Sequence, residues 1–247
     1  MKILKKSVIA FQLLTMGNLV AQTVVVNEDF TYDDGTLVGE SGGIGFTEAW
    51  SVTTTNASGV LSEVDGGTLA TNPDGLPGGF IDNDSIAERS FIGINGDSLE
   101  INLDYALISD TEGQYSFQFI LLDSAGSEVF TAGITNDSYE ISFAGGQTVT
   151  QGVDASPFND TLTLSLDLAS SSLGVDSAVF SSLDTTLTSI ASFDFTSGGT
   201  IQVVASDLDQ NQIALDNITI ATVPEPSSFF LVSCAALIPI FRRNRRS

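Results

Sequence analysis

The chain has 247 residues, of which 31 are acidic and 8 basic, and it contains no histidine and a single cysteine, Cys234. Without an imidazole, serine and cysteine triads are excluded, as are zinc sites built from histidine and cysteine. The net charge of −23 excludes nucleic acid as a partner, because binding to a phosphate backbone depends on lysine and arginine.

The first 21 residues have the pattern of a signal peptide. Three lysines within residues 2–6 precede a mostly apolar run, 8–20, and Ala21 offers a small residue before a cut ahead of Gln22. A basic start, a short apolar centre and a small residue at the cut are the features of an export signal. We therefore expect residues 1–21 to be removed and the Sec translocon to be a partner in export.

The remaining body, residues 22–222, is more acidic than the whole chain. Of the 8 basic residues, 3 lie before Gln22 and 4 after Thr222, so only Arg89 remains, while of the 31 acidic residues only Glu225 lies outside the body. The body thus carries 30 acidic residues against one basic residue, a net charge of −29. Such a charge favours a salty medium, where ions screen the repulsion, or specific binding of calcium, and the two are compatible.

Near the start of the body, a carboxylate falls in phase with apolar residues. If the apolar side chains of the first strand point inward, Glu28 does too, and the same phase in the last strand turns Asp216 inward. A buried carboxylate needs a partner. Because the first and last strands of jelly rolls often lie close together, Glu28, Asp29 and Asp216, assisted by Asp207 and Asp209, are candidate ligands of one structural calcium ion.

Two alternatives to calcium remain open from the sequence. Arg89 is the only basic partner in the body, and hydrogen bonds to strand-end amides or to Asn217 would also satisfy a carboxylate. An EF-hand is excluded, because Gln212 replaces the glycine of that loop and Ile218 replaces its closing glutamate.

Two aromatic residues, Phe46 and Trp50, follow in a glycine-rich neighbourhood typical of loops. They are candidates for stacking on sugar rings, with core packing as the alternative. The nearest approach to a glycosidase signature is Glu63-Val64-Asp65, but Thr68 stands where a family-16-like glucanase has its third acidic residue. Two carboxylates suffice for glycoside hydrolysis, so a carboxylate-only glycan-active enzyme is the weaker alternative to the non-enzyme that we expect.

From residue 98 onward, apolar and polar residues alternate. Leu99, Ile101, Leu103 and Tyr105 form one alternating run, and the leucines at 162, 164, 166 and 168 form another. A period of two predicts half-buried antiparallel strands. Further strands are predicted at 115–122, central in its sheet, and at 200–205 and 213–220. Turn sequences such as Asn95-Gly96 separate the strands at short intervals.

We therefore expect residues 22–222 to form an all-β, two-sheet antiparallel β-sandwich, a jelly roll. The closing stretch, Ile213-Ala214-Leu215-Asp216-Asn217-Ile218-Thr219-Ile220, resembles the final strand of laminin-G-like and concanavalin-like jelly rolls. The resemblance implies this fold and no particular ligand.

The last segment, 223–247, combines a proline motif, an apolar run and a basic end. Pro224-Glu225-Pro226 precedes an apolar stretch from Phe229 to Phe241, and the chain then ends with Arg242, Arg243, Arg245 and Arg246. We expect the stretch to enter a bilayer as a short helix while the arginines stay on the cytoplasmic side. It is shorter than the roughly 20 residues of a stable spanning helix, which suits a transient stop better than a permanent anchor.

This tail closely resembles the PEP-CTERM sorting signal of Gram-negative bacteria that make exopolysaccharide. The stretch from Asn27 to Trp50 is also similar to the openings of exported proteins of that class. The resemblance implies an inner-membrane intermediate, processing by an exosortase, and delivery to the cell surface or the extracellular matrix. An ordinary C-terminal membrane anchor is the alternative. The sequence thus favours an exported, non-catalytic sandwich that associates with polysaccharide or mediates adhesion, with a passive structural surface protein as the alternative.

Overall fold

The computed structural model describes residues 22–32, 35–54, 63–65, 68–70, 85–109, 116–135, 138–153, 158–206 and 212–223. Residues 24–222 form one compact unit. The described residues form strands and connecting loops and contain no helix, and hence none long and apolar enough to cross a membrane. The predicted signal peptide and the sorting segment, including Pro224, Glu225, Pro226, the apolar run and the terminal arginines, lie outside the described residues.

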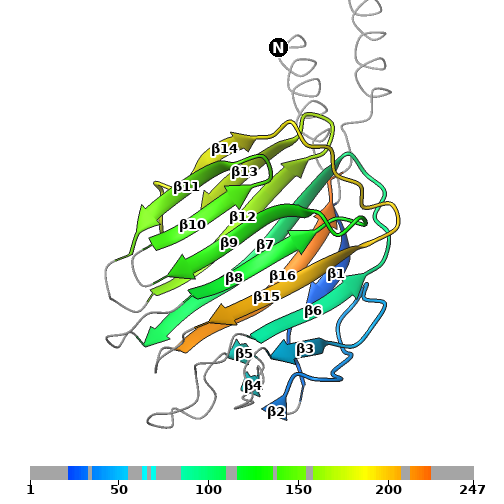
Figure 1. Ribbon diagram of the computed structural model, residues 1–247, viewed down its shortest axis with the longest axis vertical. Coiled ribbons are helices and arrows are strands. Elements are labelled where there is room, and N and C mark those ends of the chain that lie inside the picture. Colours follow the sequence, from blue (N-terminus) through cyan, green and yellow to red (C-terminus); the bar gives the residue numbers. More distant parts are fainter. Residues whose placement is uncertain are drawn as a thin grey trace, which may run out of the picture. The chain divides into compact units, whose positions relative to one another are not determined.

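The strands are arranged in two sheets that pack face to face, which confirms the predicted all-β sandwich (Figure 1). Within the described residues the larger sheet has the order β14-β13-β12-β7-β16-β5-β4-β2, and β1 also pairs with β16. Its strands are β1 (Thr23–Glu28), β2 (Gly35–Thr36), β4 (Glu63–Asp65), β5 (Thr68–Ala70), β7 (Ser98–Ser109), β12 (Phe158–Asp167), β13 (Ser172–Ser177), β14 (Thr185–Thr188) and β16 (Gln212–Thr222). The first and last strands are therefore neighbours, as expected.

The second sheet has the order β11-β10-β9-β8-β15-β6-β3. Its strands are β3 (Ser51–Thr54), β6 (Ser85–Phe91), β8 (Ser116–Leu122), β9 (Glu128–Thr135), β10 (Ser138–Phe143), β11 (Gln147–Gly152) and β15 (Gly199–Ser206). The strand predicted at 115–122 is β8 and lies in the middle of this sheet, paired antiparallel with β9 and β15.

The predicted alternation sets the inner face of the larger sheet. On β7 the side chains at 99, 101, 103 and 105 are buried. They lie beside β12, where Leu162 pairs with Leu103 and Leu164 with Ile101. Because successive strand residues point to opposite faces, the polar residues between them lie on the outer face of the same strands.

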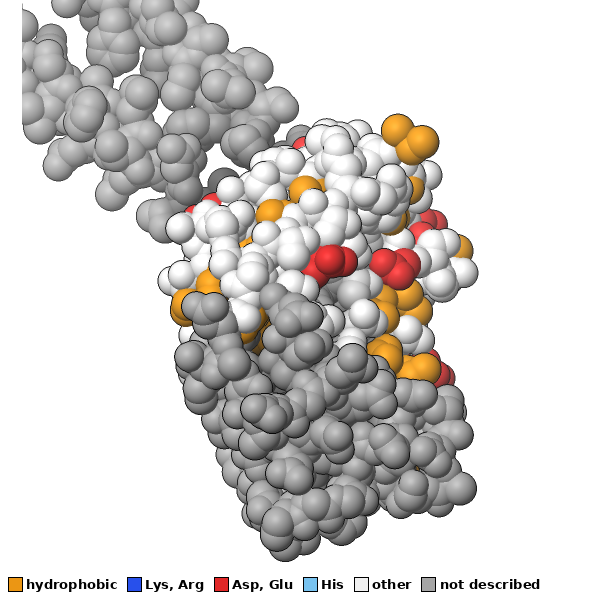
Figure 2. Space-filling view, turned by 60° about the vertical axis from the view of Figure 1, so that its left-hand side comes forward, with side chains coloured by type: hydrophobic (Ala, Val, Ile, Leu, Met, Phe, Trp, Pro, Cys, Tyr) orange, Lys and Arg blue, Asp and Glu red, His pale blue; other side chains and the backbone are white. Residues whose placement is uncertain are grey.

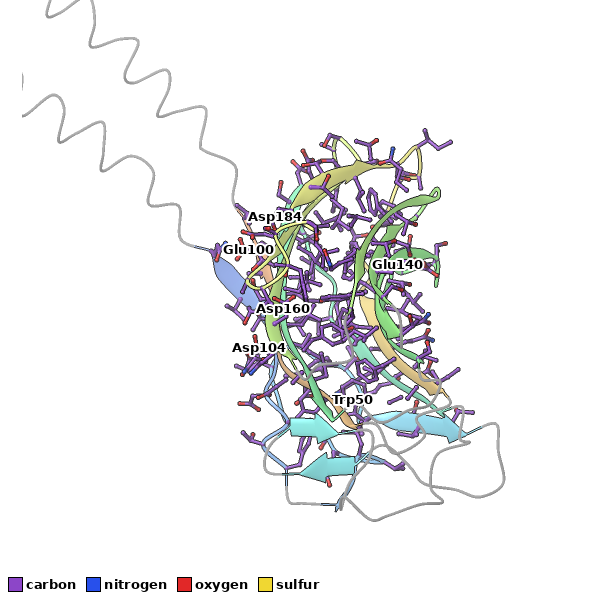
Figure 3. All side chains as sticks on the ribbon, turned by 90° about the vertical axis from the view of Figure 1, so that its left-hand side faces the viewer. Trp50, Glu100, Asp104, Glu140, Asp160 and Asp184 are labelled. Carbon is purple, nitrogen blue, oxygen red and sulfur yellow. The ribbon has the colours of Figure 1, made fainter. Side chains whose placement is uncertain are left out.

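The core fills the space between the sheets (Figure 3). Tyr105 of β7 packs edge-on against Phe117 of β8, with ring centroids 5.7 Å apart, and its hydroxyl donates to the carbonyl of Ala132 on β9 over 2.7 Å. Full burial of a core side chain such as Phe117 contributes about 1.5–3 kcal/mol to the free energy of unfolding. Because the phenol also satisfies its hydroxyl on the opposite sheet, Tyr105 fixes the two layers together.

A short segment, residues 44–46, connects the two sheets at one side of the sandwich. Ile44 forms an antiparallel bridge with Asn27 of β1, and Phe46 forms another with Phe91 of β6. β1 belongs to the larger sheet and β6 to the smaller one. This segment therefore brings the N-terminal strand close to β6, where the only basic residue of the body lies.

Candidate functional site

Glu28, predicted as a calcium ligand, is completely buried at the end of β1. Its Oε1 accepts a hydrogen bond from the backbone N–H of Phe30 (3.0 Å). Its Oε2 accepts from the hydroxyl of Tyr32 (2.8 Å), the indole Nε1 of Trp50 (3.0 Å) and Nη1 of Arg89 (2.5 Å). The carboxylate is thus enclosed by protein donors, and its charge is balanced by a guanidinium.

Arg89 on β6 is 3 % exposed and uses all its nitrogens within the protein. Besides Glu28, Nη1 donates to the Tyr32 hydroxyl (2.8 Å), Nε to the carbonyl of Glu48 (2.8 Å) and Nη2 to the carbonyl of Gly42 (2.7 Å). Its Cζ lies 3.9 Å from the centre of the Phe46 ring, a distance at which a guanidinium is attracted to an aromatic face. We call Glu28, Tyr32, Phe46, Trp50 and Arg89 the Arg89 cluster.

The Arg89 cluster also fixes the backbone around it. Phe30 has a left-handed φ of 47°, which is costly for a large side chain, and the Glu28 carboxylate holds its N–H in that conformation. Gly42 lies against Tyr32, because an added Cβ would stand 2.7 Å from the Tyr32 ring. Burial raises the pKa of the Tyr32 hydroxyl to about 12, with the Glu28 carboxylate adding to the shift and Arg89 opposing it. Tyr32 is therefore a neutral hydrogen-bond donor.

These contacts correct two expectations. Glu28 is the partner of Arg89, the alternative left open above, rather than a carboxylate available to calcium. Trp50 is 2 % exposed and packs 6.0 Å from Phe30, so it presents no ring face to a sugar and the core-packing alternative applies. Phe46 is half-buried and covers the guanidinium. Sequence reasoning selected all three residues, but for separate roles that the structure does not give them.

The predicted inward orientation of Asp216 is wrong. Asp216 pairs directly with Asp104 on β7, and Asp104 points outward because Leu103 and Tyr105 on either side of it are buried. A register shift between Asp216 and Thr219, with Asn217 at a left-handed φ of 50°, changes the phase of β16. Ile218 can then point inward while Asp216 stays outside.

Of the remaining predicted calcium ligands, Asp29 is the one that the structure describes. Asp29 is half-buried and accepts hydrogen bonds from the N–H and hydroxyl of Thr31, and Asp207 and Asp209 lie outside the described residues. In the described part of the chain, no three acidic or thiol side chains are placed so as to hold a metal ion.

The outer face of β12, β7 and β16 carries a hydrogen-bonded row of polar side chains. Figure 3 shows Glu100 and Asp104 on this side of the sandwich. We call the following residues the outer polar face: Asn102, Asp104, Thr161, Thr163, Asp216, Asn217 and Thr219. They come from three adjacent strands in register, as the pairs Thr163–Asn102 and Thr161–Asp104 show.

Hydrogen bonds orient the groups of the outer polar face. Thr161 Oγ1 donates to Asp104 Oδ1 (2.6 Å) and Asn217 Nδ2 to Asp104 Oδ2 (2.8 Å). Thr163 Oγ1 donates to Asn102 Oδ1 over 2.7 Å. Partial burial raises the pKa of Asp216, and the nearby carboxylates of Asp104, Asp29 and Glu28 raise it further. The face therefore presents fixed hydroxyl, amide and carboxylate groups, both donors and acceptors.

A second buried carboxylate, Asp160, was missed by the sequence analysis. It is 1 % exposed on β12 and accepts hydrogen bonds from Ser177 Oγ (2.8 Å) and the N–H of Val179 (3.0 Å). Burial raises its pKa. The signal was available, because Asp160 is in phase with Leu162, just as Glu28 is in phase with Val26. Its role is to hold the loop after β13.

No protein-family model and no curated protein matches the chain. Among solved structures, the sandwich is similar to the CBM2 module of the evolved Dit of Lactobacillus casei BL23 phage J-1, with 11% identity and a TM-score of 0.54 over 82% of this chain and 96% of that one. It is also similar to a seed lectin of Lotus tetragonolobus, with 11% identity and a TM-score of 0.50 over 83% of this chain and 100% of that one.

A sialidase aligns with 70% of this chain at 13% identity and a TM-score of 0.49, but the chain spans only 17% of the length of that sialidase. At these identities the likenesses establish the fold. The fold that the architecture and the comparisons define is a jelly-roll β-sandwich, in agreement with the fold predicted from the sequence.

Proposed function

We propose that this protein is an exported surface or matrix protein whose β-sandwich binds uncharged polysaccharide without catalysing its breakdown. The observation that carries the proposal is the outer polar face, in which three adjacent strands hold donors and acceptors in fixed positions. The similar solved structures include a module named as a carbohydrate-binding one and a seed lectin, which supports a sugar ligand for the same fold.

The mixture of groups on the outer polar face matches sugar hydroxyls. A hydroxyl both donates and accepts hydrogen bonds, so it can accept from the second Nδ2 hydrogen of Asn217 and donate to Asp104 or to the oxygen of Thr163. A ligand that only donates, such as an ammonium group, would satisfy the carboxylates but not the remaining amide hydrogen of Asn217. The row crosses three adjacent strands, β12, β7 and β16, and such an extended row suits a polymer better than a small molecule, which is usually held in a concave pocket.

Charge sets the class of polysaccharide. Arg89 is the only basic residue between 22 and 222, and it is buried against Glu28. In the described part of Figure 2, acidic side chains are scattered among uncharged polar atoms and no basic side chain is visible. A uronic or sulfated polymer would meet only repulsion on such a surface, so an uncharged polymer is the ligand that we propose.

The affinity of a single domain is expected to be low. Trp50 is buried, and the large apolar side chains exposed on the described surface are aliphatic: Val24, Val38, Ile44, Ile92, Val179 and Ile190. The partly exposed aromatic residues Tyr32, Phe46, Phe180 and Phe193 pack against the core, so none of the described aromatic side chains is fully exposed for stacking on a sugar ring. Many copies at a surface would compensate, because linked sites bind a polymer far more tightly than one site does.

The test is retention of the purified full chain on three immobilised polysaccharides that are uncharged, carboxylated and amine-bearing. We expect retention on the uncharged polymer that changes little with salt. Retention only on the amine-bearing polymer, lost as salt rises, would show a purely electrostatic interaction. Lack of retention on all three would favour the passive structural alternative, and release of shortened sugars from any of them would favour the enzyme.

Export and sorting form the second part of the proposal. The signal-peptide pattern of residues 1–21 and the resemblance of 223–247 to PEP-CTERM tails support passage through Sec, an inner-membrane intermediate and processing by an exosortase. The test replaces Pro224, Glu225 and Pro226 with alanine and follows the protein by cell fractionation. We expect the variant to accumulate in the inner membrane, whereas unchanged delivery to the cell surface would contradict the sorting role.

A further inference from the structure

Asn95-Gly96 was predicted as a turn, and the structure places it in an irregular connection instead. Residues 92–97 run from β6 in one sheet to β7 in the other, so they do not form a hairpin. Neither Asn95 nor Gly96 has a left-handed φ. A Cβ added to Gly96 would meet only ordinary contacts, the nearest being the Thr222 methyl at 3.5 Å. Neither backbone conformation nor packing therefore requires this Asn-Gly pair.

The connection is held on both sides of the pair but not at the pair itself. Ile94 is 3 % exposed, and its N–H donates to the carbonyl of Phe195 over 2.8 Å. The carbonyl of Asp97 accepts from the N–H of Leu168, also over 2.8 Å. Asn95 and Gly96 between these anchors are exposed and belong to no strand. Water and hydroxide can therefore reach both residues.

We propose that Asn95 is a site of spontaneous deamidation in the folded protein. The backbone nitrogen of Gly96 loses its proton and attacks Cγ of Asn95, a C–N bond forms to give a five-membered succinimide, and the side-chain nitrogen leaves as ammonia. Water then opens the ring at either carbonyl, yielding aspartate or isoaspartate. Gly96 makes the attack possible, because no side chain stands beside the nucleophilic nitrogen.

The two products affect the connection differently. Aspartate keeps the main chain and adds one negative charge at an exposed position. Isoaspartate routes the main chain through Cγ and adds one methylene between the anchors at Ile94 and Asp97. Since Ile94 is buried and Asp97 is bonded to Leu168, the extra length must be absorbed between these two anchors, which strains the bonds that hold them. The isoaspartate form is therefore the less stable of the two.

The test incubates the full chain in mildly alkaline buffer and maps peptides by mass spectrometry, with a urea-unfolded sample in parallel. We expect Asn95 to be lost at comparable rates in both samples, with aspartate and isoaspartate as products. Asn102, in the ladder of β7 and followed by leucine, is the internal control and should stay intact in the folded sample. Survival of Asn95 in the folded sample while it reacts in urea would overturn the proposal.

Two variants separate chemistry from folding. Gly96→Ala introduces a side chain that the available space accepts, so the fold should be kept and the reaction strongly slowed. Asn95→Asp reproduces the charge without the extra methylene, and its melting temperature should match that of the wild type. An aged wild-type sample containing isoaspartate should melt lower than this variant. Equal loss of Asn95 in the Gly96→Ala variant would contradict attack by the Gly96 nitrogen.

Discussion

Arg89 Nη1 donates to Glu28 Oε2 over 2.5 Å, and this ion pair joins β6 of one sheet to β1 of the other. Both side chains are almost completely inaccessible to solvent. The only positive charge of residues 22–222 is therefore used inside the sandwich, and the surface of this body carries carboxylates without a basic side chain among them. This distribution of charge underlies the stability predictions below and the proposal of an uncharged ligand.

Removing Arg89 is expected to destabilise the sandwich strongly. Arg89→Met leaves the Glu28 carboxylate buried without its counter-charge, a change that typically costs about 3–5 kcal/mol. Urea unfolding of the variant measures this loss. The double variant Glu28→Gln with Arg89→Met removes both charges and should recover part of the stability. If the single variant unfolds like the wild type, the ion pair is not a determinant of stability.

Asp160 is expected to make stability depend on pH with a defined sign. Burial raises the pKa of the Asp160 carboxyl above its ordinary value, so the folded state binds a proton more tightly than the unfolded state. The resulting contribution to stability is fully present below the pKa that Asp160 has in the unfolded state. It is lost as the pH rises through the pKa of the folded state. The free energy of unfolding of Asp160→Asn, relative to that of the wild type, should therefore be higher at neutral than at acidic pH. Urea unfolding across that range measures it.

Asp194 provides the control of opposite sign. Hydrogen bonds from the N–H and hydroxyl of Thr196 lower its pKa, so its contribution is present above the unfolded pKa and is lost on acidification. The free energy of unfolding of Asp194→Asn, relative to that of the wild type, should be lower at neutral than at acidic pH. The same pH trend in both variants would contradict the assignment.

Salt is expected to stabilise the protein. The body carries 30 acidic residues and one basic residue, and screening of their repulsion favours the compact state. The melting temperature should rise by several degrees between low and high sodium chloride. Calcium and a chelator, compared at equal ionic strength, should give the same melting temperature if no specific calcium site is present. A calcium effect that disappears in an Asp216→Ala variant would revive the metal site.

Trp50 reports on its own role, because it is the only tryptophan in the chain. Its indole is buried and donates to Glu28, so fluorescence should be shielded from acrylamide and should not respond to a bound polysaccharide. Quenching at saturating polysaccharide, in a sample that remains folded, would instead support the sugar-stacking role that the structure does not give it.

The two-sheet sandwich could be predicted from the sequence, because a period of two in the apolar residues indicates which face of a strand is buried. Leu99 to Tyr105 on β7 and residues 116–122 on β8 follow it closely. The same pattern gave the wrong orientation for Asp216. A register shift between Asp216 and Thr219 changes which side chains of β16 point inward, so an alternation counted back from Ile218 no longer applies. Such a bulge depends on the neighbouring strand and leaves no mark in the local pattern.

The sites were harder to predict than the fold, because their members are distant in the chain. Glu28, Trp50 and Arg89 meet across up to 61 positions of sequence, and nothing in the local pattern indicates which carboxylate the only arginine pairs with. The outer polar face was missed for a similar reason, since Asn102, Thr163 and Thr219 each read as an ordinary solvent-facing residue. Their alignment becomes visible only in the register of three strands.

The most direct test of the central claim compares two matched double variants on an uncharged polysaccharide that retains the wild type. Asn102→Ala with Thr163→Ala removes a cross-strand pair from the outer polar face, and Thr131→Ala with Ser142→Ala removes a corresponding pair from the other sheet. We predict that the first variant loses retention, the second keeps it, and both melt at similar temperatures. Equal retention by the two variants would contradict binding at the outer polar face.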